Sequence, residues 1–539
     1  MTATGTDRVV LDGASLTPEA VVAVAREDAT VTVADDAREA VRTSRERVES
    51  VLESGETVYG VTTGFGDLVD ERIPPSDLEA LQVNLLRSHA AGVGPELPRE
   101  AVRAMLVARV NALVKGYSGV REAVVDALVD LLNAGVTPVV PAVGSLGASG
   151  DLAPLAHTSL VLVGEGEAVV DGEGLPGDEA LATAGLDPLT LRAKEGLALI
   201  NGTQLSVGVG ALAVHDATRV VQSADVAGAL TTEVTLGSTV PSHPAVSAVR
   251  PHPGQAASAR NVRRCTAESG IVESHRNCDR VQDAYSLRCL PQVHGAVREA
   301  IDHLRGAVET ELNSATDNPL LFAREDAPDR ASGTGDAAVL SAGNFHGEPL
   351  ALKLDYATAA LTELAAISER RVDRLLNPSV QEPHLPPFLT EASGLRSGYM
   401  VAQYTAAAVL NECRATGRHA TDSTPVSGNQ EDHVSMSAGA ALSLREVVEH
   451  VGTVVGIELL CGAQATEFLD GETAVAGDGE SADDAASHGV GTAVAYETVR
   501  EVVPRLDGDR EVHVDIDRAA TLVAAGLLVE RVSEAVDLE

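Results

Sequence analysis

A run of small residues around one serine could carry unusual chemistry. Residues 144–155 read GSLGASGDLAPL, for which the simplest interpretation is a strained turn followed by the start of a helix. A second interpretation is backbone cyclisation, in which the Gly150 nitrogen attacks the Ala148 carbonyl, because only glycine offers an unhindered nitrogen and a free φ. Loss of water from the ring and from Ser149 would then leave an exocyclic methylene conjugated to a carbonyl. No ordinary side chain supplies such an electrophile.

The same segment resembles the signature of the aromatic amino acid ammonia-lyases, and further segments of that family occur in order from about residue 57 to about residue 515. The resemblance implies a 4-methylidene-imidazol-5-one, in which Ser149 becomes a dehydroalanine and Ala148 is linked to Gly150. It implies that the substrate amine adds to this group and leaves as ammonia. Neither a metal nor a diffusible cofactor is expected.

A tyrosine lies in a glycine-rich segment, residues 58–66 (VYGVTTGFG), which resembles the family's active-site loop. The glycines would give this loop the mobility of a lid. The resemblance implies that Tyr59 is the general base that removes the β-proton, and its ordinary pKa of about 10 would have to fall for that role. Taken alone, a tyrosine in such a segment would be interpreted as surface packing.

Two further segments, NGTQ at residue 201 and QDAYSLRC at residue 282, resemble other parts of the family's site. Asn201 is implied to donate a hydrogen bond to the electrophile's carbonyl oxygen, where negative charge collects. Arg288 is implied to bind the substrate carboxylate, because its planar guanidinium pairs with two oxygens at once. The resemblance places Tyr285 among the catalytic residues and Gln282 among those that bind substrate.

The segments TDNP and GNFHG are also similar to the family's. They imply that Phe345 packs near the substrate. Asn318 and His346 are interpreted as supporting residues outside the chemistry, and so are His157 and His433.

Two positions bear on the substrate. His89, in SHAAG, lies at a position where the resemblance implies contact with the substrate side chain. Tyrosine-acting members of the family also carry a histidine there. Glu431, in NQEDH, discriminates better, because phenylalanine-specific relatives lack this acid. A buried carboxylate without a cation is costly, and an imidazole ring offers donors that satisfy it. With Gln430 as a further substrate-binding residue, the pattern resembles the histidine-specific branch, which forms trans-urocanate and ammonia in the first step of histidine degradation. Glu431 is expected among the catalytic residues, orienting the imidazole or sharing proton transfer.

Other activities stay open. A tyrosine or phenylalanine ammonia-lyase would use the same scaffold, and so would a 2,3-aminomutase that holds ammonia long enough to re-add it. A helical scaffold protein without catalytic activity is an alternative of a different class, against which the intact tripeptide with Tyr59, Asn201 and Arg288 argues. A fumarase-type lyase shares the long helices, but its Gly-Ser-Ser lid segment is not seen in the sequence.

Periodic apolar patterns predict an all-α fold, a bundle of long helices with a small mixed α/β region near the N-terminus, resembling the fumarase/aspartase-like lyase scaffold. Capping residues predict helix starts at Thr17-Pro18 and at Ser76. Long helices are expected at residues 206–235, 291–312, 350–364, 396–415 and 436–468, and short strands at 9–11, 31–33 and 168–171. Residues 323–339 and 471–489 are interpreted as surface loops. The chain is expected to form one unit over 1–539, with parts at about 1–200, 201–470 and 471–539.

Charge and composition narrow the class of partner. The chain carries 40 basic and 79 acidic residues, a formal net charge of −39, and only three of its cations are lysines. Such a surface repels phosphate backbones and anionic lipids, so neither nucleic acid nor a membrane is an expected partner. Few lysines with dispersed carboxylates resemble proteins of salt-loaded cytoplasm, which favours a halophilic archaeal source. Five cysteines without C-x-x-C spacing, and no signal peptide, predict a cytoplasmic protein. A homotetramer is expected from the family resemblance.

Overall fold

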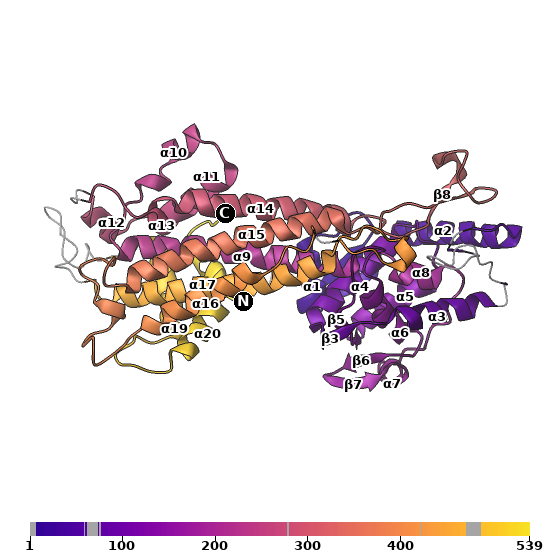
Figure 1. Cartoon of the computed structure of the whole chain (residues 1–539), viewed down its shortest axis with the longest axis horizontal. Helices are drawn as coiled ribbons and strands as arrows, with labels where there is room; N and C mark the ends of the chain where they lie inside the picture. The colour runs from indigo at the N-terminus through magenta and orange to yellow at the C-terminus, as the bar shows by residue number, and fades with distance from the viewer. Residues whose placement is uncertain are drawn as a thin grey trace. The chain divides into compact units, whose positions relative to one another are not determined.

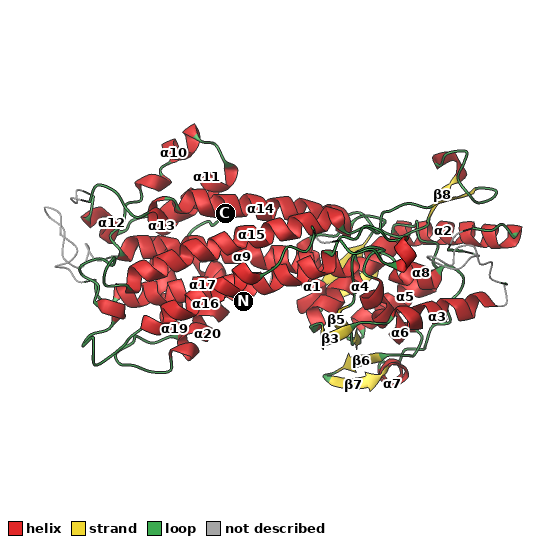
Figure 2. Cartoon of the chain, in the orientation of Figure 1, coloured by secondary structure: helices red, strands yellow, loops and turns green. Residues whose placement is uncertain are grey.

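The computed structural model describes residues 7–58, 60–61, 74, 77–276, 280–421, 423–469 and 487–539. Helices dominate this part of the chain and strands are few and short (Figure 2), so the predicted all-α class is confirmed. Within the same residues, none of the helices combines the length and the apolar character that a bilayer crossing requires.

Contacts divide the chain into two compact units (Figure 1 follows the chain by residue number). The first unit comprises Met1–His215, Leu304–Asp355 and Arg418–Arg445; the second comprises Asp216–His303, Tyr356–Gly417 and Glu446–Glu539. Four of the five boundaries fall inside long helices, α9 (Gln204–Val234), α14 (Leu290–Leu312), α15 (Glu348–Leu376) and α17 (Ser437–Thr466), and the fifth, between Gly417 and Arg418, follows α16 (Met400–Ala415). Each unit is therefore assembled from interleaved segments, whereas the sequence suggested consecutive parts. The interpretation of the whole chain as one catalytic unit stays a prediction.

The first unit holds the mixed region and several shorter helices. Its helices are α1 (Pro18–Arg26), α2 (Asp35–Ser54), α3 (Leu78–His89), α4 (Arg99–Val114), α5 (Glu122–Asn133), α6 (Leu152–Leu162), α7 (Gly177–Thr183) and α8 (Glu195–Ile200). Its strands are β1 (Arg8–Leu11), β2 (Thr30–Val33), β3 (Val93–Glu96), β4 (Thr137–Pro138), β5 (Pro141–Val143), β6 (Glu167–Val170), β7 (Glu173–Pro176), β8 (Leu320–Ala323) and β9 (Ala337–Leu340). They form four small sheets, β1-β2 (parallel), β3-β5, β4-β6-β7 and β8-β9.

Helix α4 lies at the centre of the first unit. Every residue from Ala101 to Val114 is buried, and the helix packs against α1, α2 and α5. Two arginines, Arg103 and Arg109, interrupt this apolar run, and both are 1 % exposed. A buried guanidinium is costly unless its donors are paired, so each arginine marks a place where α4 meets backbone carbonyls.

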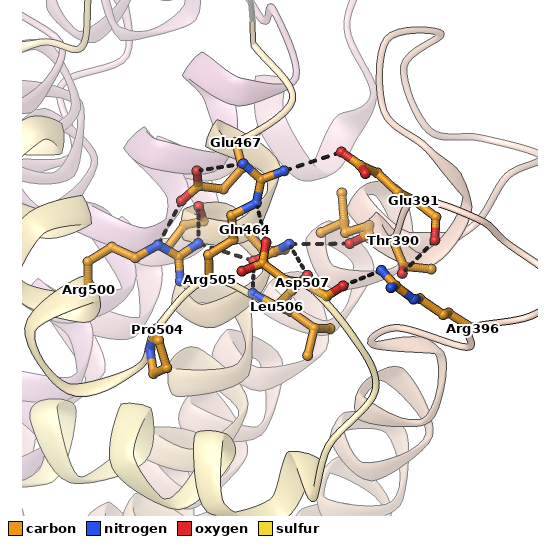
Figure 3. A network of polar contacts seen from close by, with 12 residues as sticks. Thr390, Glu391, Arg396, Gln464, Glu467, Arg500, Pro504, Arg505, Leu506 and Asp507 are labelled. Atoms are coloured by element: carbon orange, nitrogen blue, oxygen red, sulfur yellow. Dashed lines mark hydrogen bonds and ion pairs between the residues drawn. The ribbon is translucent and has the colours of Figure 1, made fainter.

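The second unit is helical. Besides its parts of the four long helices it contains α10 (Pro244–Val249), α11 (Pro253–Cys265), α12 (Gly270–Ser274), α13 (Tyr285–Arg288), α16 (Met400–Ala415), α19 (Val490–Val502), α20 (Val512–Ala524) and α21 (Leu527–Ala535). A polar network ties the loop after α19 to the end of α17 (Figure 3). There Glu467 accepts a hydrogen bond from Arg500 at 2.9 Å, and Gln464 accepts from the Leu506 backbone at 3.0 Å.

Most predicted elements are confirmed. Thr17 caps α1 by accepting from the Ala20 nitrogen at 3.2 Å, and the five predicted long helices and three predicted strands are all present. The predicted cap at Ser76 lies outside the described residues; α3 itself begins at Leu78. The interpretation of 323–339 as a loop is partly wrong, because its two ends belong to the antiparallel pair β8-β9, whose buried Leu321 and Val339 pack against α2. Most of the second predicted loop, 471–489, lies outside the described residues.

Glu458 joins three helices inside the second unit. Its carboxylate, fully buried, accepts two hydrogen bonds from Arg371 of α15 at 2.5 and 2.8 Å. Thr231 of α9 and Ser368 of α15 donate to the same carboxylate at 2.8 and 2.7 Å. Such a pair stabilises the fold only while both residues are present, because removing one leaves the other as an unpaired buried charge.

We expect Glu458→Gln to lower the free energy of unfolding by about 3–5 kcal/mol, since Arg371 would lose its counter-charge in the core. Thermal unfolding of the variant and the wild type measures this loss. Glu501→Gln is the matched control, because Glu501 pairs with Arg531 at 3.4 Å on the surface and should contribute less than about 1 kcal/mol. Equal effects of the two substitutions would contradict the prediction.

Candidate active site

The serine turn is compressed against a second stretch of backbone. It lies between β5 and α6, and Gly150 has φ +74°, a left-handed conformation that favours glycine. A Cβ on Gly150 would lie 2.2 Å from the Gly202 carbonyl oxygen, so no other residue fits there. The Asp151 nitrogen donates to the same oxygen at 2.7 Å. Residue 150 must therefore be glycine for steric reasons as well as for the chemistry proposed from the sequence.

Asn201 is brought to the turn by the end of helix α8. The helix stops at Ile200, and Asn201 takes an extended conformation that turns its buried side chain toward the serine turn. Its Nδ2 donates to the Ser149 carbonyl oxygen at 3.1 Å. The sequence predicted this proximity only through the family resemblance.

The opposite side of the turn is held by two segments from far along the chain. The Gly147 carbonyl accepts from the Gly347 nitrogen at 3.1 Å and from the Ser435 hydroxyl at 3.0 Å. The Met436 nitrogen donates to the Leu146 carbonyl at 2.7 Å. Gly347 belongs to a segment that the sequence had already marked, whereas Ser435 carries no signal beyond following NQEDH by two residues.

Asp151 is a buried carboxylate at the start of α6, and it bonds to the first turn of α9. It accepts hydrogen bonds from the Ser145 hydroxyl at 2.7 Å and from the Ser206 nitrogen at 2.9 Å. Burial raises the pKa of Asp151 above its ordinary value, although these hydrogen bonds act in the opposite direction. The carboxylate thus links the serine turn to the N-terminus of α9, where a negative group is favourable.

A cavity of about 530 Å³ in the first unit collects half of the predicted residues. The predicted site residues that line it are Ala148, Ser149, Asn201, Phe345, Gln430 and Glu431. The Ser149 hydroxyl donates to Glu431 Oε1 at 3.4 Å. Asn318, His346 and His433, interpreted from the sequence as supporting residues, also line this cavity. Two of these make further contacts, since the rings of His346 and His433 stack with centroids 5.7 Å apart.

Two predicted residues of the first unit lie elsewhere or are not described. His89 is half-buried at the end of α3, with its Nδ1 2.9 Å from the Leu85 carbonyl, and it is not among the residues that line this cavity. Tyr59 lies outside the described residues. Its neighbours Val58 and Val61 are both 2 % exposed and belong to a cluster with α2 and the β8-β9 pair.

Gln282, Tyr285 and Arg288 belong to the second unit. There Gln282 and Arg288 line a cavity of about 560 Å³, and the Arg288 guanidinium lies 4.8 Å from the centre of the Tyr285 ring. Arg280, which lines the same cavity, pairs with Glu382 and with Asp283. Within the described part of the chain no carboxylate lies within 4 Å of Arg288, so its charge is available to an anionic ligand.

A histidine holds the turn that follows His89. The Gly92 nitrogen donates to His157 Nε2 at 3.1 Å, which requires that nitrogen to be unprotonated. Burial lowers the pKa of His157 below its ordinary value. As for metal ions, the described residues contain no group of three or more His, Cys, Asp or Glu side chains placed to bind one.

Comparison with known proteins shows the family to which the chain belongs. Residues 16–501 match the model of the family "Aromatic amino acid lyase". The chain therefore belongs to the aromatic amino acid lyase family.

The chain is 63 % identical over 532 residues, 99 % of each sequence, to a protein of Halobacterium salinarum named "Probable histidine ammonia-lyase". Among solved structures it resembles a histidine ammonia-lyase from Trypanosoma cruzi, with TM-score 0.86, 39 % identity and coverage of 98 % and 96 % of the two chains. It also resembles a tyrosine aminomutase from Streptomyces globisporus, with TM-score 0.89, 37 % identity and 99 % coverage of both chains. The predicted all-α bundle of long helices is thus confirmed, and the likeness of fold alone does not select a substrate.

The contact between His157 and Gly92 predicts a pH dependence of stability. Because burial holds the folded-state pKa of His157 below the ordinary value of about 6.5, the neutral ring contributes stability that is fully present above that pH. The stabilisation is lost as the pH falls from 6.5 toward the folded-state pKa. His157→Gln keeps an acceptor for the Gly92 nitrogen but cannot be protonated. We expect thermal unfolding of this variant to vary less between pH 7 and pH 5 than that of the wild type. The exposed His513→Gln is the control, and equal pH slopes for all three proteins would be the contrary result.

Proposed function

We propose that this chain eliminates ammonia from L-histidine and forms trans-urocanate. The observation that carries the proposal is Glu431, which faces Ser149 across the cavity at 3.4 Å. Of the described cations, none lies within ion-pair distance of this carboxylate, so its charge is left for a ligand with N–H donors such as an imidazole. Relatives named histidine ammonia-lyase, 63 % and 51 % identical over nearly the whole chain, support the same substrate.

The tripeptide fits the 4-methylidene-imidazol-5-one that the family resemblance implies. Gly150 is held in a conformation and a space that only glycine can occupy. Ala148 is buried, and the Ser149 carbonyl accepts a hydrogen bond from the Asn201 amide. When formed, the group supplies an electrophilic alkene that accepts the substrate amine.

The other residues act on the substrate and on the developing charge. Asn201 stabilises negative charge on the Ser149 carbonyl oxygen, to which its Nδ2 donates at 3.1 Å. Arg288 binds the substrate carboxylate through its paired N–H groups, with its plane held against the Tyr285 ring. Glu431 accepts from the imidazole and fixes its orientation. Tyr59 is proposed as the base for the β-proton by family resemblance.

We propose a homotetramer in which copies of the chain share their active sites. Ala148 and Ser149 line a cavity of the first unit, whereas Arg288 and Gln282 line a cavity of the second. Joining the first unit of one copy to the second unit of another would supply both halves of the substrate site, as the family resemblance implies.

The acidic composition and the Halobacterium salinarum relative support a salt-rich cytoplasm as the compartment.

A 2,3-aminomutase is the second candidate, favoured by the likeness to the tyrosine aminomutase structure. An aminomutase returns ammonia to the product and releases a β-amino acid. Incubation with L-histidine, L-tyrosine and L-phenylalanine, followed by mass analysis of the products, separates the two activities. Urocanate from L-histidine alone supports the proposal, and a β-amino acid contradicts it.

We expect Ser149→Ala to abolish urocanate formation, because alanine has no hydroxyl to lose and no methylene can form. The intact mass of the wild type should be lighter than its sequence mass by two waters, and the variant should lack the loss from residue 149. Ser54→Ala, at the exposed end of α2, is the control that keeps Ser149 and its surroundings. Unchanged urocanate production by Ser149→Ala would overturn the proposed chemistry.

Glu431→Gln should change the choice of substrate. A charged acceptor contributes about 1.5–3 kcal/mol to a hydrogen bond, so kcat/KM for L-histidine should fall roughly 10- to 100-fold. Activity toward L-phenylalanine, which has no ring N–H, should fall less or rise. The ratio of the two kcat/KM values measures the effect, and an unchanged ratio would remove Glu431 from substrate recognition. Asp432→Asn, a neighbour that lines the same cavity, is the matched control.

A further inference from the structure

Arg109 is a fully buried cation that the proposed chemistry does not use. It lies in α4 and is 1 % exposed. Its Nη2 donates to the Asn201 carbonyl at 2.6 Å and also to the Ala198 carbonyl, and its Nη1 donates to Gln204 Oε1 at 2.8 Å. One guanidinium thus grips the segment from the last turn of α8 to the first residue of α9.

This segment is the one that presses on the serine turn. Asn201 donates to the Ser149 carbonyl, and the Gly202 carbonyl accepts from Asp151 while blocking any Cβ on Gly150. A Cβ on Gly202 would lie 2.8 Å from Arg109 Nη1, so the guanidinium is packed directly behind it. Arg109 and the tripeptide segment therefore contact the same two residues of backbone, Asn201 and Gly202.

The contacts of Arg109 are anchored in turn. Gln204 Nε2 donates to the Thr316 hydroxyl at 2.8 Å, which ties the same segment to the residues before β8. Burial lowers the pKa of Arg109 to about 10, so the guanidinium stays protonated at neutral pH and all its contacts are charge-assisted. Three carbonyl and amide oxygens at one planar group fix position and orientation together.

We propose that Arg109 is a positioning residue for the electrophile, holding the Asn201–Gly202 backbone against Ser149 and Gly150 so that the ring closes and the Asn201 amide stays on its oxygen. The inference rests on the proposed function. Closure forms one bond, from the Gly150 nitrogen to the Ala148 carbonyl carbon. The first water takes the Ala148 oxygen and the N–H hydrogens of Ser149 and Gly150; the second takes the Ser149 hydroxyl and α-hydrogen. No oxidant or reductant is needed.

The test compares two arginines of the same helix. Arg103, six residues earlier in α4, is equally buried and also donates to backbone carbonyls, those of Val24 and Leu132. Its contacts lie at α1 and α5 and include an ion pair with Asp28, away from the tripeptide. Arg109→Lys and Arg103→Lys therefore make the same chemical change, and each leaves a carbonyl without its planar donor.

The first readout is the intact mass, which does not depend on turnover. In Arg109→Lys the share of chains lighter by two waters should fall about twofold or more, and kcat per modified chain should fall about tenfold, with KM less affected. Arg103→Lys should be modified like the wild type and keep its kcat, even if both variants lose thermal stability equally. A fully modified Arg109→Lys with wild-type kcat overturns the proposal, and so does an equal loss of modification in Arg103→Lys.

A second variant decides the matter if Arg109→Lys does not fold. Gln204→Met removes one acceptor of the guanidinium and keeps the shape of the side chain, and it should give an intermediate loss of the two-water modification. Full modification of Gln204→Met would then overturn the proposal. A wild-type chain with the unmodified sequence mass would contradict the proposed function itself, and this inference with it. If the wild type and the Arg109 and Gln204 variants all carried the two-water modification, the role of Arg109 would be contradicted and the proposed function would not.

Discussion

The close approach of two backbone segments, at Gly150 and Gly202, is the constraint on which the site depends. There is no room for a Cβ on Gly150, and the Gly202 carbonyl is held by the Asp151 nitrogen at 2.7 Å. Most of the buried polar groups near the site serve this approach. Asp151 joins the turn to α9, and the Gly347 and Ser435 segments press on it from the other side. Packed interiors transmit such compression because they contain few voids.

Two residues of the predicted site, Glu431 in the first unit and Arg288 in the second, have no counter-charge among the described residues. Among the described residues, no cation lies within ion-pair distance of Glu431. No described carboxylate lies within that distance of Arg288. Other buried charges have partners inside the protein: Lys194 pairs with Asp317 at 2.7 Å, and Asp151 and Arg109 are held by neutral hydrogen-bonding groups. An amino acid with a basic ring offers the complementary groups, a carboxylate for the arginine and N–H donors for the glutamate. The strongly acidic surface has no part in this recognition, because exposed charges are screened by salt within about 10 Å.

Much of the fold could be predicted from the sequence, since amphipathic periodicity sets the long helices. The stripe from Leu350 to Leu364 is buried as its 4-3-4-3 spacing requires. The small β8-β9 pair was missed because its strands are separated by a polar stretch that carries no hairpin signal. Within the site, Ala148 to Gly150 and Asn201 were found by motif. Arg109 was not found, because the residues around an arginine in an apolar helix do not indicate which carbonyls it will contact. Its partners lie about 90 residues away in the chain, and only tertiary packing selects them.

The interleaving of the two units also sets the order in which the protein can mature. A ribosome releases Ala148 to Gly150 long before Gly347 and Ser435, which hold the turn, have been synthesised. The first unit cannot be completed until residue 445 has emerged, by which time most of the second unit has been made as well. The ring closure proposed above would therefore follow the synthesis of most of the chain. Neither unit is one continuous piece of polypeptide, so neither can be expressed separately as a single uninterrupted segment of this chain.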